Sequence, residues 1–315
     1  MSQNASSDSQ PLVLGIDLGG TSAKIGVCRG EDIIFKDQPV RTSDHDGADA
    51  LLEAMLGRIK ALQQQFPGIA GVGVGVPGFV DSNSGLVHEL TNIPGWHEVY
   101  LAKLIREATG LPAVAENDAN CMGLAELYFG AARGLKHFIA ITLGTGVGGA
   151  VFIDGKLFHG ARGGAGEVGQ MSIDYRGVPG PHGNTGALER YVGNRQVAGR
   201  AAELYAAAGR QKSAQECSPA ALAAAAGEGD AIALAVWDEF TTQLACGLSH
   251  GVWLLNPEAI VIGGGLAAAG DLVFKPLREK LNAQLATVFR ENLFVIPAHF
   301  GNEAGIIGAA SLIEV

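Results

Sequence analysis

The chain alternates between short apolar runs and longer stretches in which apolar residues recur at helical spacing. Two of the apolar runs share one plan. LGIDLGGTSAKIGV (residues 14–27) and IAITLGTGVGGAVF (residues 139–152) each contain two apolar segments joined by a glycine turn with a threonine. Each run predicts a β-hairpin. The copies lie too far apart in the chain for a solenoid repeat, so they indicate a fold built from two related halves.

The remaining pattern predicts further strands and helices. Strands are expected over residues 69–76, 111–116, 259–264 and 293–298, and helices over residues 48–65, 100–110, 120–130, 187–209, 230–256, 271–289 and 303–314. Strands that alternate with helices indicate an α/β protein whose sheet is mainly parallel beyond the hairpins. Because no linker of Pro or Ser separates the halves, we place the boundary near residues 116–120.

Composition favours a folded protein and disfavours nucleic acid or an anionic membrane as a partner. The 315 residues are 47% hydrophobic and 17% charged, which is enough for two domains with sizeable cores. The net charge of -10 opposes binding to nucleic acid or to an anionic membrane. The first ten residues do not resemble a signal peptide, and no apolar run approaches the roughly 20 residues that span a bilayer. We therefore expect a cytoplasmic protein. Its four cysteines match no ligand spacing.

Glycine patterns in the chain disfavour a dinucleotide-binding fold and exclude a P-loop. The best match to a dinucleotide fingerprint is GGGLAAAG after the strand at 259–264, but no acidic residue follows at the distance that a ribose contact requires. The P-loop motif G-x-x-x-x-G-K-[ST] is absent from the sequence.

The paired glycine turns have a more specific interpretation. Glycine lets backbone N–H groups approach an anion, and a threonine hydroxyl adds a donor. Two such turns, with Thr21 and Thr145, predict a polyphosphate site. Asp17 in the first hairpin would then hold Mg²⁺ through water. The alternative is that both are ordinary hairpins, although the matched pair favours phosphate.

Glu116, Asn117 and Asp118 lie where a buried strand leads into a helix, in the stretch ENDAN. One interpretation is structural, because Asp and Asn are good N-caps. The other is chemical, with Asp118 as a catalytic base and Asn117 as a substrate ligand. Taken alone, the stretch leans slightly toward the cap, and the rest of the chain has to decide.

Several motifs together resemble the ROK family of sugar kinases and repressors. They are IDLGGT, GVGVGVPGFVD, NIPGW, ENDAN, LGTGVGG, HGARGGAGEVG, GALE, AIVIGGG and GNEAGIIGAA, and they extend over residues 11–315. The resemblance implies a two-domain actin-like (ribonuclease H-like) ATPase fold with a nucleotide and sugar cleft between the domains. We expect a disordered polar tail over 1–10, a first domain over 11–117 joined by the C-terminal helix 303–315, and a second domain over 118–302.

The resemblance also implies a set of site residues. The nucleotide phosphates, with Mg²⁺ near Asp17, and the adenosine would be bound by Asp17, Gly19, Gly20, Thr21, Lys24, Thr145, Gly146, Gly264 and Gly265. The sugar would contact Asn92, Asn117, Asp118, Glu167, Gln170 and Glu189. Asp118 would act as the general base that removes a proton from the sugar hydroxyl. Without the resemblance, Glu167 would be read as a loop carboxylate, and Glu189 as a favourable charge in a first helical turn.

The chain departs from the family at its zinc site. Many members carry three cysteines and a histidine there, whereas this chain has Gly180, His182, Ala187 and Gln170. A closed structural zinc site needs four ligands, so we predict no zinc. The loop 177–189 must be held in another way, and Pro179 and Pro181 would contribute by restricting its backbone. We expect Gln170 to preserve sugar binding but to alter affinity or sugar preference.

The resulting expectation is an ATP-dependent kinase that converts glucose to glucose 6-phosphate. Fructose, mannose, N-acetylglucosamine and N-acetylmannosamine stay open as alternative sugars, and polyphosphate as an alternative donor. A non-catalytic sugar-sensing repressor is the alternative of another class. It is disfavoured because about ten polar residues precede IDLGGT where repressors of the family have a helix-turn-helix domain. The resemblance further implies a homodimer or homotetramer.

Overall fold

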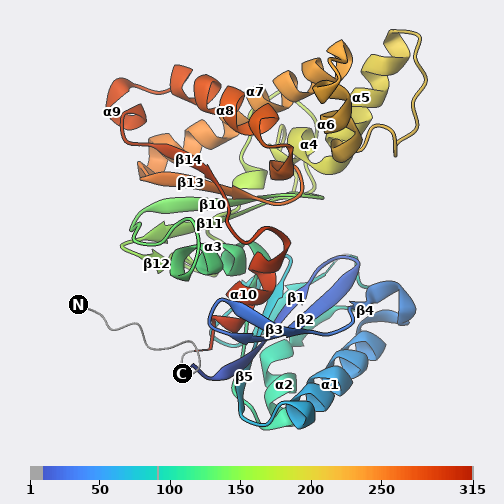
Figure 1. Ribbon diagram of the computed structural model, residues 1–315, viewed down its shortest axis with the longest axis vertical. Coiled ribbons are helices and arrows are strands. Elements are labelled where there is room, and N and C mark those ends of the chain that lie inside the picture. The colour runs from blue at the N-terminus through green and yellow to red at the C-terminus, as the bar shows by residue number, and fades with distance from the viewer. Residues whose placement is uncertain (1–9, 91, 314–315) are drawn as a thin grey trace. The chain divides into compact units, whose positions relative to one another are not determined.

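The computed structural model describes residues 10–90 and 92–313 and separates into two compact units (Figure 1). The first unit contains the described chain up to Arg133, together with His159–Ala165 and the stretch from Asn302. The second unit contains Gly134–Phe158 and Gly166–Gly301. The predicted disordered tail, residues 1–10, lies outside the described residues apart from Gln10.

The predicted boundary after Asn117 differs from this division. Residues up to Arg133 belong to the first unit, because helix α3 (Asp118–Tyr128) packs against helix α10 (Ala304–Ala310) of the same unit. The extent of each folding domain stays a prediction.

The first unit is built on a mixed sheet in the order β3-β2-β1-β5-β9, with β4 beside β2. Its strands are β1 (Leu12–Leu18), β2 (Ser22–Arg29), β3 (Asp32–Lys36), β4 (Val40–Arg41), β5 (Ile69–Val76) and β9 (Ala113–Asn117). Strands β1 and β2 form the predicted antiparallel hairpin, whereas β1–β5 and β5–β9 are parallel pairs. A small antiparallel sheet of β6 (Val80–Asp81), β7 (Leu86–Glu89) and β8 (His97–Tyr100) completes the unit.

Side chains of β1 alternate between two faces of this sheet, as the period of a strand requires. Leu14 and Ile16 enter a large core with α1 (Gly47–Gln65) and α2 (Leu101–Thr109). Val13 points to the opposite face, where it packs with residues of α10. The sheet of the first unit is therefore covered on both faces.

The second unit repeats the plan of the first. Its sheet has the order β12-β11-β10-β13-β14. The strands are β10 (Phe138–Leu143), β11 (Val147–Ile153), β12 (Lys156–Leu157), β13 (Ala259–Gly263) and β14 (Phe294–Pro297). The β10–β11 hairpin is antiparallel, and β13 and β14 follow in parallel. Both sheets thus share strand order and directions, which confirms the prediction of two related halves.

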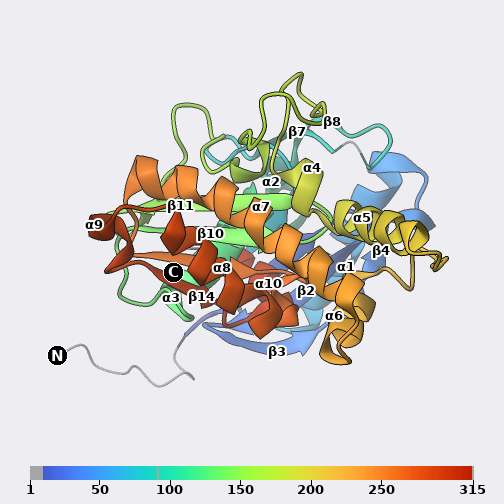
Figure 2. The same cartoon turned by 90° about the horizontal axis from the view of Figure 1, so that it is seen from above.

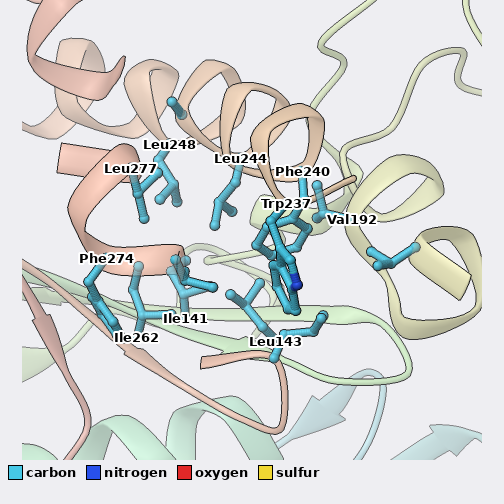
Figure 3. Close-up of a cluster of buried hydrophobic side chains, with 14 of the residues drawn as sticks. Ile141, Leu143, Val192, Trp237, Phe240, Leu244, Leu248, Ile262, Phe274 and Leu277 are labelled. Carbon is cyan, nitrogen blue, oxygen red and sulfur yellow. The ribbon is translucent and has the colours of Figure 1, made fainter. Parts of the chain in front are cut away.

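Helices cover the sheet of the second unit. They are α4 (Glu189–Val192), α5 (Asn194–Ala207), α6 (Pro219–Gly227), α7 (Ala231–Leu255), α8 (Asp271–Ala283) and α9 (Thr287–Arg290). Figure 2 shows α7 lying across β10 and β11, with α8 beside it. In Figure 3, Trp237, Phe240 and Leu244 of α7 pack over Ile141 and Leu143 of β10. The rings of Trp237 and Phe240 meet edge to face at 5.4 Å, so this unit has its own well-packed apolar core.

Two helices that the sequence predicted as continuous are broken. The helix predicted over 187–209 divides at Gly193, whose backbone is extended (φ -68°, ψ 156°). A Cβ atom there would lie 2.8 Å from the carbonyl oxygen of Thr145, so the break lets the chain pass close to the β10–β11 turn. The helix predicted over 271–289 divides similarly at Ala286 (φ -67°, ψ 153°).

The shortest elements escaped the periodicity analysis. Strands β3, β4, β6, β7, β8 and β12, helix α6 and several 3₁₀ turns were not predicted. Most of these strands have only two to five residues, too few for alternation to be distinguished from a loop. The 3₁₀ turns are η2 (Thr42–Asp44), η3 (Val168–Gln170), η4 (Ala267–Ala269) and η5 (Gly301–Glu303).

The structure also bears on two sequence expectations, the lack of a membrane span and the state of the four cysteines. Over the two described ranges, no helix is both long enough and apolar enough to cross a membrane. Cys28, Cys121 and Cys217 are buried free thiols, and Cys246 is half-buried. Burial raises the pKa of the Cys28 thiol to about 12, so this thiol stays protonated.

Helix α10 packs unusually closely within the first unit. A Cβ atom on Gly308 of α10 would overlap the carbonyl oxygen of Cys121 in α3. A Cβ atom on Gly73 of β5 would overlap the carbonyl oxygen of Ala309. Only glycine allows backbones to approach this closely, so these positions fix where α3 and α10 lie.

We expect Gly308→Ala to lower the free energy of unfolding by about 1–3 kcal/mol, because the added methyl group overpacks the α3–α10 contact. Gly57→Ala is the matched control: Gly57 is an exposed residue of helix α1 with open space around it. That substitution should raise stability by about 0.5–1 kcal/mol. Urea unfolding of the two variants measures both effects, and equal effects would contradict the close-packing argument.

Candidate active site

The predicted site residues of the first unit gather at the carboxyl ends of β1, β5 and β9. The strand register places Asp17 of β1 beside Gly75 of β5, and Val76 beside Asn117 of β9. In open α/β sheets, ligands bind beyond this edge of the strands. The sheet of the first unit therefore brings Asp17, Asn117 and Asp118 to one edge.

Asp17 is held between a strand and a helix. Its Oδ2 lies 3.1 Å from Lys24 Nζ across the β1–β2 hairpin. A Cβ atom on Gly305 of α10 would lie 2.8 Å from its Cγ. Lys24 is 46% exposed, so the pair is largely solvated and contributes little to stability. The pair instead fixes the direction of a carboxylate next to the glycine turn.

The glycine turn between β1 and β2 exposes Gly20 and Thr21. The turn is closed by the Gly19 N–H, which donates to Ser22 O at 2.9 Å. A Cβ atom on Gly20 would lie only 2.8 Å from Asn92 Nδ2. Glycine therefore lets Asn92, a predicted sugar ligand, approach a turn that is predicted to bind phosphate.

Asn117, not Asp118, is the N-cap of α3. Its Oδ1 accepts hydrogen bonds from the backbone N–H groups of Ala119 (2.9 Å) and Asn120 (3.1 Å). Its Nδ2 donates to Gly78 O at 3.1 Å. An asparagine amide has two N–H donors, so the second can still serve a ligand.

Asp118 is therefore not the N-cap residue, a choice that the sequence left open. It is the first residue of α3 and is half-buried. Its Oδ1 accepts a hydrogen bond from the Ala119 N–H at 2.8 Å. A carboxylate in the first helical turn is stabilised by the helix dipole. The structure thus supplies an oriented carboxylate directly after the cap.

Glu116 is a buried carboxylate with four hydrogen-bond donors around it. Oε1 accepts from the Asn117 N–H (2.7 Å) and Asn120 Nδ2 (2.9 Å). Oε2 accepts from Ser82 Oγ and lies against His159 Nε2, both at 2.7 Å. Burial acts to raise the pKa of Glu116, but the four hydrogen bonds outweigh it and lower that pKa. The hydrogen bond to Glu116 raises the pKa of His159.

This pairing was missed by the sequence analysis. Glu116 and His159 are 43 positions apart; Glu116 was named without a role of its own, and His159 appeared only as the first residue of HGARGGAGEVG. A glutamate before an N-cap and a histidine before a glycine-rich segment give no pairing signal. Their proximity depends on tertiary structure.

The second unit brings its predicted phosphate and adenosine residues to a corresponding edge. Strand register places Thr142 of β10 beside Gly263 of β13, so the turn with Thr145 and Gly146 and the turn with Gly264 and Gly265 follow neighbouring strand ends. Gly264 has φ +89° and packs on the backbone of β10, whereas the space at Gly265 is open.

Glu189 reaches back to the β10–β11 turn. Its Oε2 accepts a hydrogen bond from the Val147 N–H at 2.9 Å, and a Cβ atom on Gly146 would overlap that oxygen. The Asn194 N–H donates to Gly144 O at 2.9 Å. The short helix α4 and the start of α5 are therefore joined to the turn.

Glu167 directly precedes the 3₁₀ turn η3 in the same unit, and Gln170 is the last residue of that turn. Burial, and then the charge of Glu189, raise the pKa of Glu167, while His182 opposes them. Gln170 Oε1 is buried and has no hydrogen-bond partner among residues 10–90 and 92–313. Buried polar atoms in proteins are normally hydrogen-bonded, so we expect a ligand or a water molecule to donate a hydrogen bond to this oxygen.

The predicted site residues therefore fall into two groups, one in each unit. The first unit holds Asp17, Gly19, Gly20, Thr21, Lys24, Asn92, Asn117 and Asp118. The second unit holds Thr145, Gly146, Glu167, Gln170, Glu189, Gly264 and Gly265. Within each unit, the sheet brings residues that are distant in sequence to one edge.

The loop over residues 177–189 is closed by hydrogen bonds. These are Gly180 N–H to Asn184 O (2.7 Å), Gly186 N–H to Val178 O (2.8 Å), Ile173 N–H to Gly186 O (2.8 Å), Ser172 Oγ to Thr185 O (2.7 Å), Asn184 Nδ2 to Gln170 O (3.0 Å) and Val178 N–H to Tyr191 Oη (3.0 Å). Across the described ranges, no group of three or more His, Cys, Asp or Glu side chains is placed to hold a metal ion. The absence of zinc stays a prediction.

Two sheets of equal topology, each with site residues at the carboxyl ends of its strands, define the class of protein as a two-domain actin-like ATPase fold. A sequence profile of the ROK family matches residues 13–315. The chain belongs to the ROK family, which confirms the resemblance that its motifs showed.

Individual relatives support this assignment. The chain is 33% identical to a glucokinase from Halalkalibacterium halodurans, covering 96% of this chain and 94% of that protein. It is also 33% identical to a glucokinase from Thermotoga maritima, covering 96% and 97%. The solved structure of a ROK family glucokinase from Streptomyces griseus, in complex with glucose and AMPPNP, is 30% identical with a TM-score of 0.82, covering 96% and 98%.

Stability should depend on pH through the Glu116–His159 pair. The lowered pKa of Glu116 means that its contribution is present above its ordinary value of 4.5 and is lost as pH falls through the lowered value. The raised pKa of His159 means that its contribution is complete below its ordinary value of 6.5 and is lost as pH rises through the raised value.

We therefore expect the stability advantage of wild type over His159→Gln to be largest between these two ordinary values, 4.5 and 6.5, and to shrink toward alkaline pH. Urea unfolding of both proteins across the pH range measures the difference, in which the contributions of other groups cancel. A difference that does not vary with pH would show that the pair is not charged.

The loop 177–189 should be independent of zinc. We expect elemental analysis of the purified protein to find no stoichiometric zinc, and EDTA to leave the Tm unchanged, because hydrogen bonds already close the loop. Tyr191→Phe removes the hydroxyl that accepts from the Val178 N–H and should lower the Tm without creating sensitivity to EDTA. Zinc at one per chain would contradict the prediction.

Proposed function

We propose that the protein is an ATP-dependent sugar kinase that converts glucose to glucose 6-phosphate. The glucokinases that cover nearly the whole chain support the reaction, and the Streptomyces griseus neighbour with bound glucose and AMPPNP supports both substrates. The observation that carries the proposal is the position of Asp118, a half-buried carboxylate that begins α3 just beyond the carboxyl end of β9 and is oriented by a hydrogen bond from the Ala119 N–H.

Asp118 acts as the general base in this proposal. It takes the proton of the sugar hydroxyl while the hydroxyl oxygen attacks the γ-phosphorus of ATP. A bond forms from that oxygen to phosphorus, the bond from phosphorus to the leaving ADP oxygen breaks, and the proton resides on Asp118. A base held in this way contributes about 10²- to 10⁴-fold to the rate, and positioning and electrostatics supply most of the rest.

MgATP is bound by the two glycine turns and Asp17. Backbone N–H groups and threonine hydroxyls of such turns suit phosphate oxygens, which assigns this role to Thr21 and Thr145. The carboxylate of Asp17 is an oxygen ligand of the kind that Mg²⁺ prefers, and Mg²⁺ usually keeps several waters. Gly265 leaves open space for the adenosine.

The sugar is bound by side chains that complement hydroxyl groups. Each hydroxyl both donates and accepts hydrogen bonds. The unpartnered Gln170 Oε1 supplies an acceptor, and the second amide hydrogen of Asn117 supplies a donor. Glu167 and Glu189 add carboxylate acceptors, and Asn92 completes the proposed set.

The test is ADP production from MgATP with glucose, mannose, fructose, N-acetylglucosamine and N-acetylmannosamine. We expect the highest kcat/KM with glucose. Asp118→Asn should lower kcat by about 10²- to 10⁴-fold with little change in the Tm, because it removes the base but keeps the shape. Asp154→Asn, which alters a carboxylate that is 82% exposed, is the control and should leave kcat unchanged.

Other outcomes would each correct a distinct part of the proposal. A higher kcat/KM with another sugar would replace glucose, and turnover with polyphosphate but not with ATP would replace the donor. Full activity of Asp118→Asn would remove Asp118 as the base. Inactivity of wild type with every sugar and both donors would overturn the kinase and leave the sugar-sensing role.

A further inference from the structure

Glu116 is a buried charge to which the proposed reaction assigns no role. The residue is only 2% exposed. Its two oxygens accept four hydrogen bonds, two each. A carboxylate offers about four acceptor sites, so this one is saturated by the protein and cannot be a substrate ligand.

The first oxygen of Glu116 fixes the turn that presents Asp118. This oxygen accepts hydrogen bonds from the backbone N–H of Asn117, the next residue, and from the side chain of Asn120, about one helical turn after Glu116. Asp118 and Ala119 lie between these two attachment points. The start of α3 is thus held from the strand side by Glu116 as well as from the helix side by its cap.

The second oxygen of Glu116 joins two segments that are distant in sequence. Ser82 lies in the turn between β6 and β7, and His159 begins residues His159–Ala165, which we call the strap. The strap belongs to the first unit, although the chain on either side of it belongs to the second. Glu167 follows the strap two residues after Ala165.

The strap packs tightly where it passes β6. A Cβ atom on Gly163, whose φ is +78°, would lie 2.6 Å from Val80 O, and one on Gly164 would contact the Phe79 ring at 3.5 Å. Within the strap, the Ala165 N–H donates to His159 O at 3.2 Å. His159 is 40% exposed at its side chain, whereas Glu116 is almost fully buried. The histidine therefore anchors the strap from the surface to a fixed internal carboxylate.

We propose that Glu116 and His159 are positioning residues for phosphoryl transfer: their bond holds the strap, which leads to Glu167, on the turn that presents Asp118. This inference rests on the proposed function, because it assigns Asp118 and Glu167 their roles there. Glu116 acts through Asp118 on the chemical step, and His159 acts through the strap on sugar binding. Neither residue touches the substrate.

The two roles predict different kinetic signatures. A displaced base lowers kcat, whereas a displaced sugar ligand raises the KM for glucose. We expect Glu116→Gln to lower kcat by about 10- to 100-fold, the effect of small misplacement near a reacting centre. We expect His159→Leu to raise the KM for glucose by about 10-fold or more, the loss typical of about one hydrogen bond to a charged group. The KM for ATP should stay unchanged in both.

Conservative and control variants separate positioning from general stability. His159→Gln keeps an N–H donor and should recover most of the affinity for glucose that His159→Leu loses. Arg162→Ala changes an exposed residue of the same strap and should leave kcat and both KM values unchanged. The double variant Glu116→Gln/His159→Leu should lose less in kcat/KM than the two single effects combined, because both substitutions break the same bond.

Hydrogen exchange provides a readout that does not require catalysis. We expect His159→Leu to increase amide exchange in residues 116–120 and in the strap while the strands of the sheet stay protected. Since His159 is partly exposed, its variants should fold even if Glu116→Gln does not.

A lowered Tm with unchanged kcat, KM for glucose and local exchange would overturn the positioning role and leave Glu116 and His159 as structural residues. Equal loss in His159→Gln and His159→Leu, or an effect of Arg162→Ala as large as theirs, would overturn it too. Inactive wild type would overturn the proposed function and this inference together. That outcome is distinguishable because it appears before any variant is made.

Discussion

Helix α10 lies against β1, β5 and α3 with backbone facing backbone, and the first unit depends on that contact. Side chains at Gly15, Gly73 or Gly308 would overlap carbonyl oxygens across it. Asp17 is the penultimate residue of β1 and Asp118 begins α3, so helix α10 sets the positions of both carboxylates. Residues from the start, middle and end of the sequence must therefore assemble together before this part of the site exists.

Buried strands and paired hairpins could be predicted from the sequence because their signals are local. The run IAGVGVGV, residues 69–76, coincides with β5, since a strand buried on both faces appears as a continuous apolar run. Strand β13 was recognised in the same way, and two glycine turns indicated two sheets of one plan. Once strand ends are known, the residues that follow them become candidates for the site, which is how Asn117 and Asp118 were found.

The parts that could not be predicted depend on contacts between distant segments. Gly193 interrupts a helical pattern because the backbone of Thr145 lies against it, and no local signal reports that contact. The bond between Glu116 and His159 has the same origin. The sequence could not decide whether Asn117 or Asp118 is the cap, because both residue types cap helices well. In the structure, the Asn117 amide also donates a hydrogen bond to Gly78 O, a contact between distant segments that holds this side chain in the capping position.

Glu116 and Asp118 lie in one short turn, but their surroundings suit one to a structural role and the other to a chemical role. Both are carboxylates, and only Asn117 lies between them. Glu116 faces the interior, where four donors replace the water that its charge would otherwise need. Because protein donors already occupy the acceptor positions of Glu116, its carboxylate is not available to take a proton from a substrate. Asp118 is half-buried at the edge of the sheet, where a ligand can approach. The hydrogen bonds and the burial of Glu116 and Asp118 thus indicate different roles for two acidic residues that residue type alone cannot distinguish.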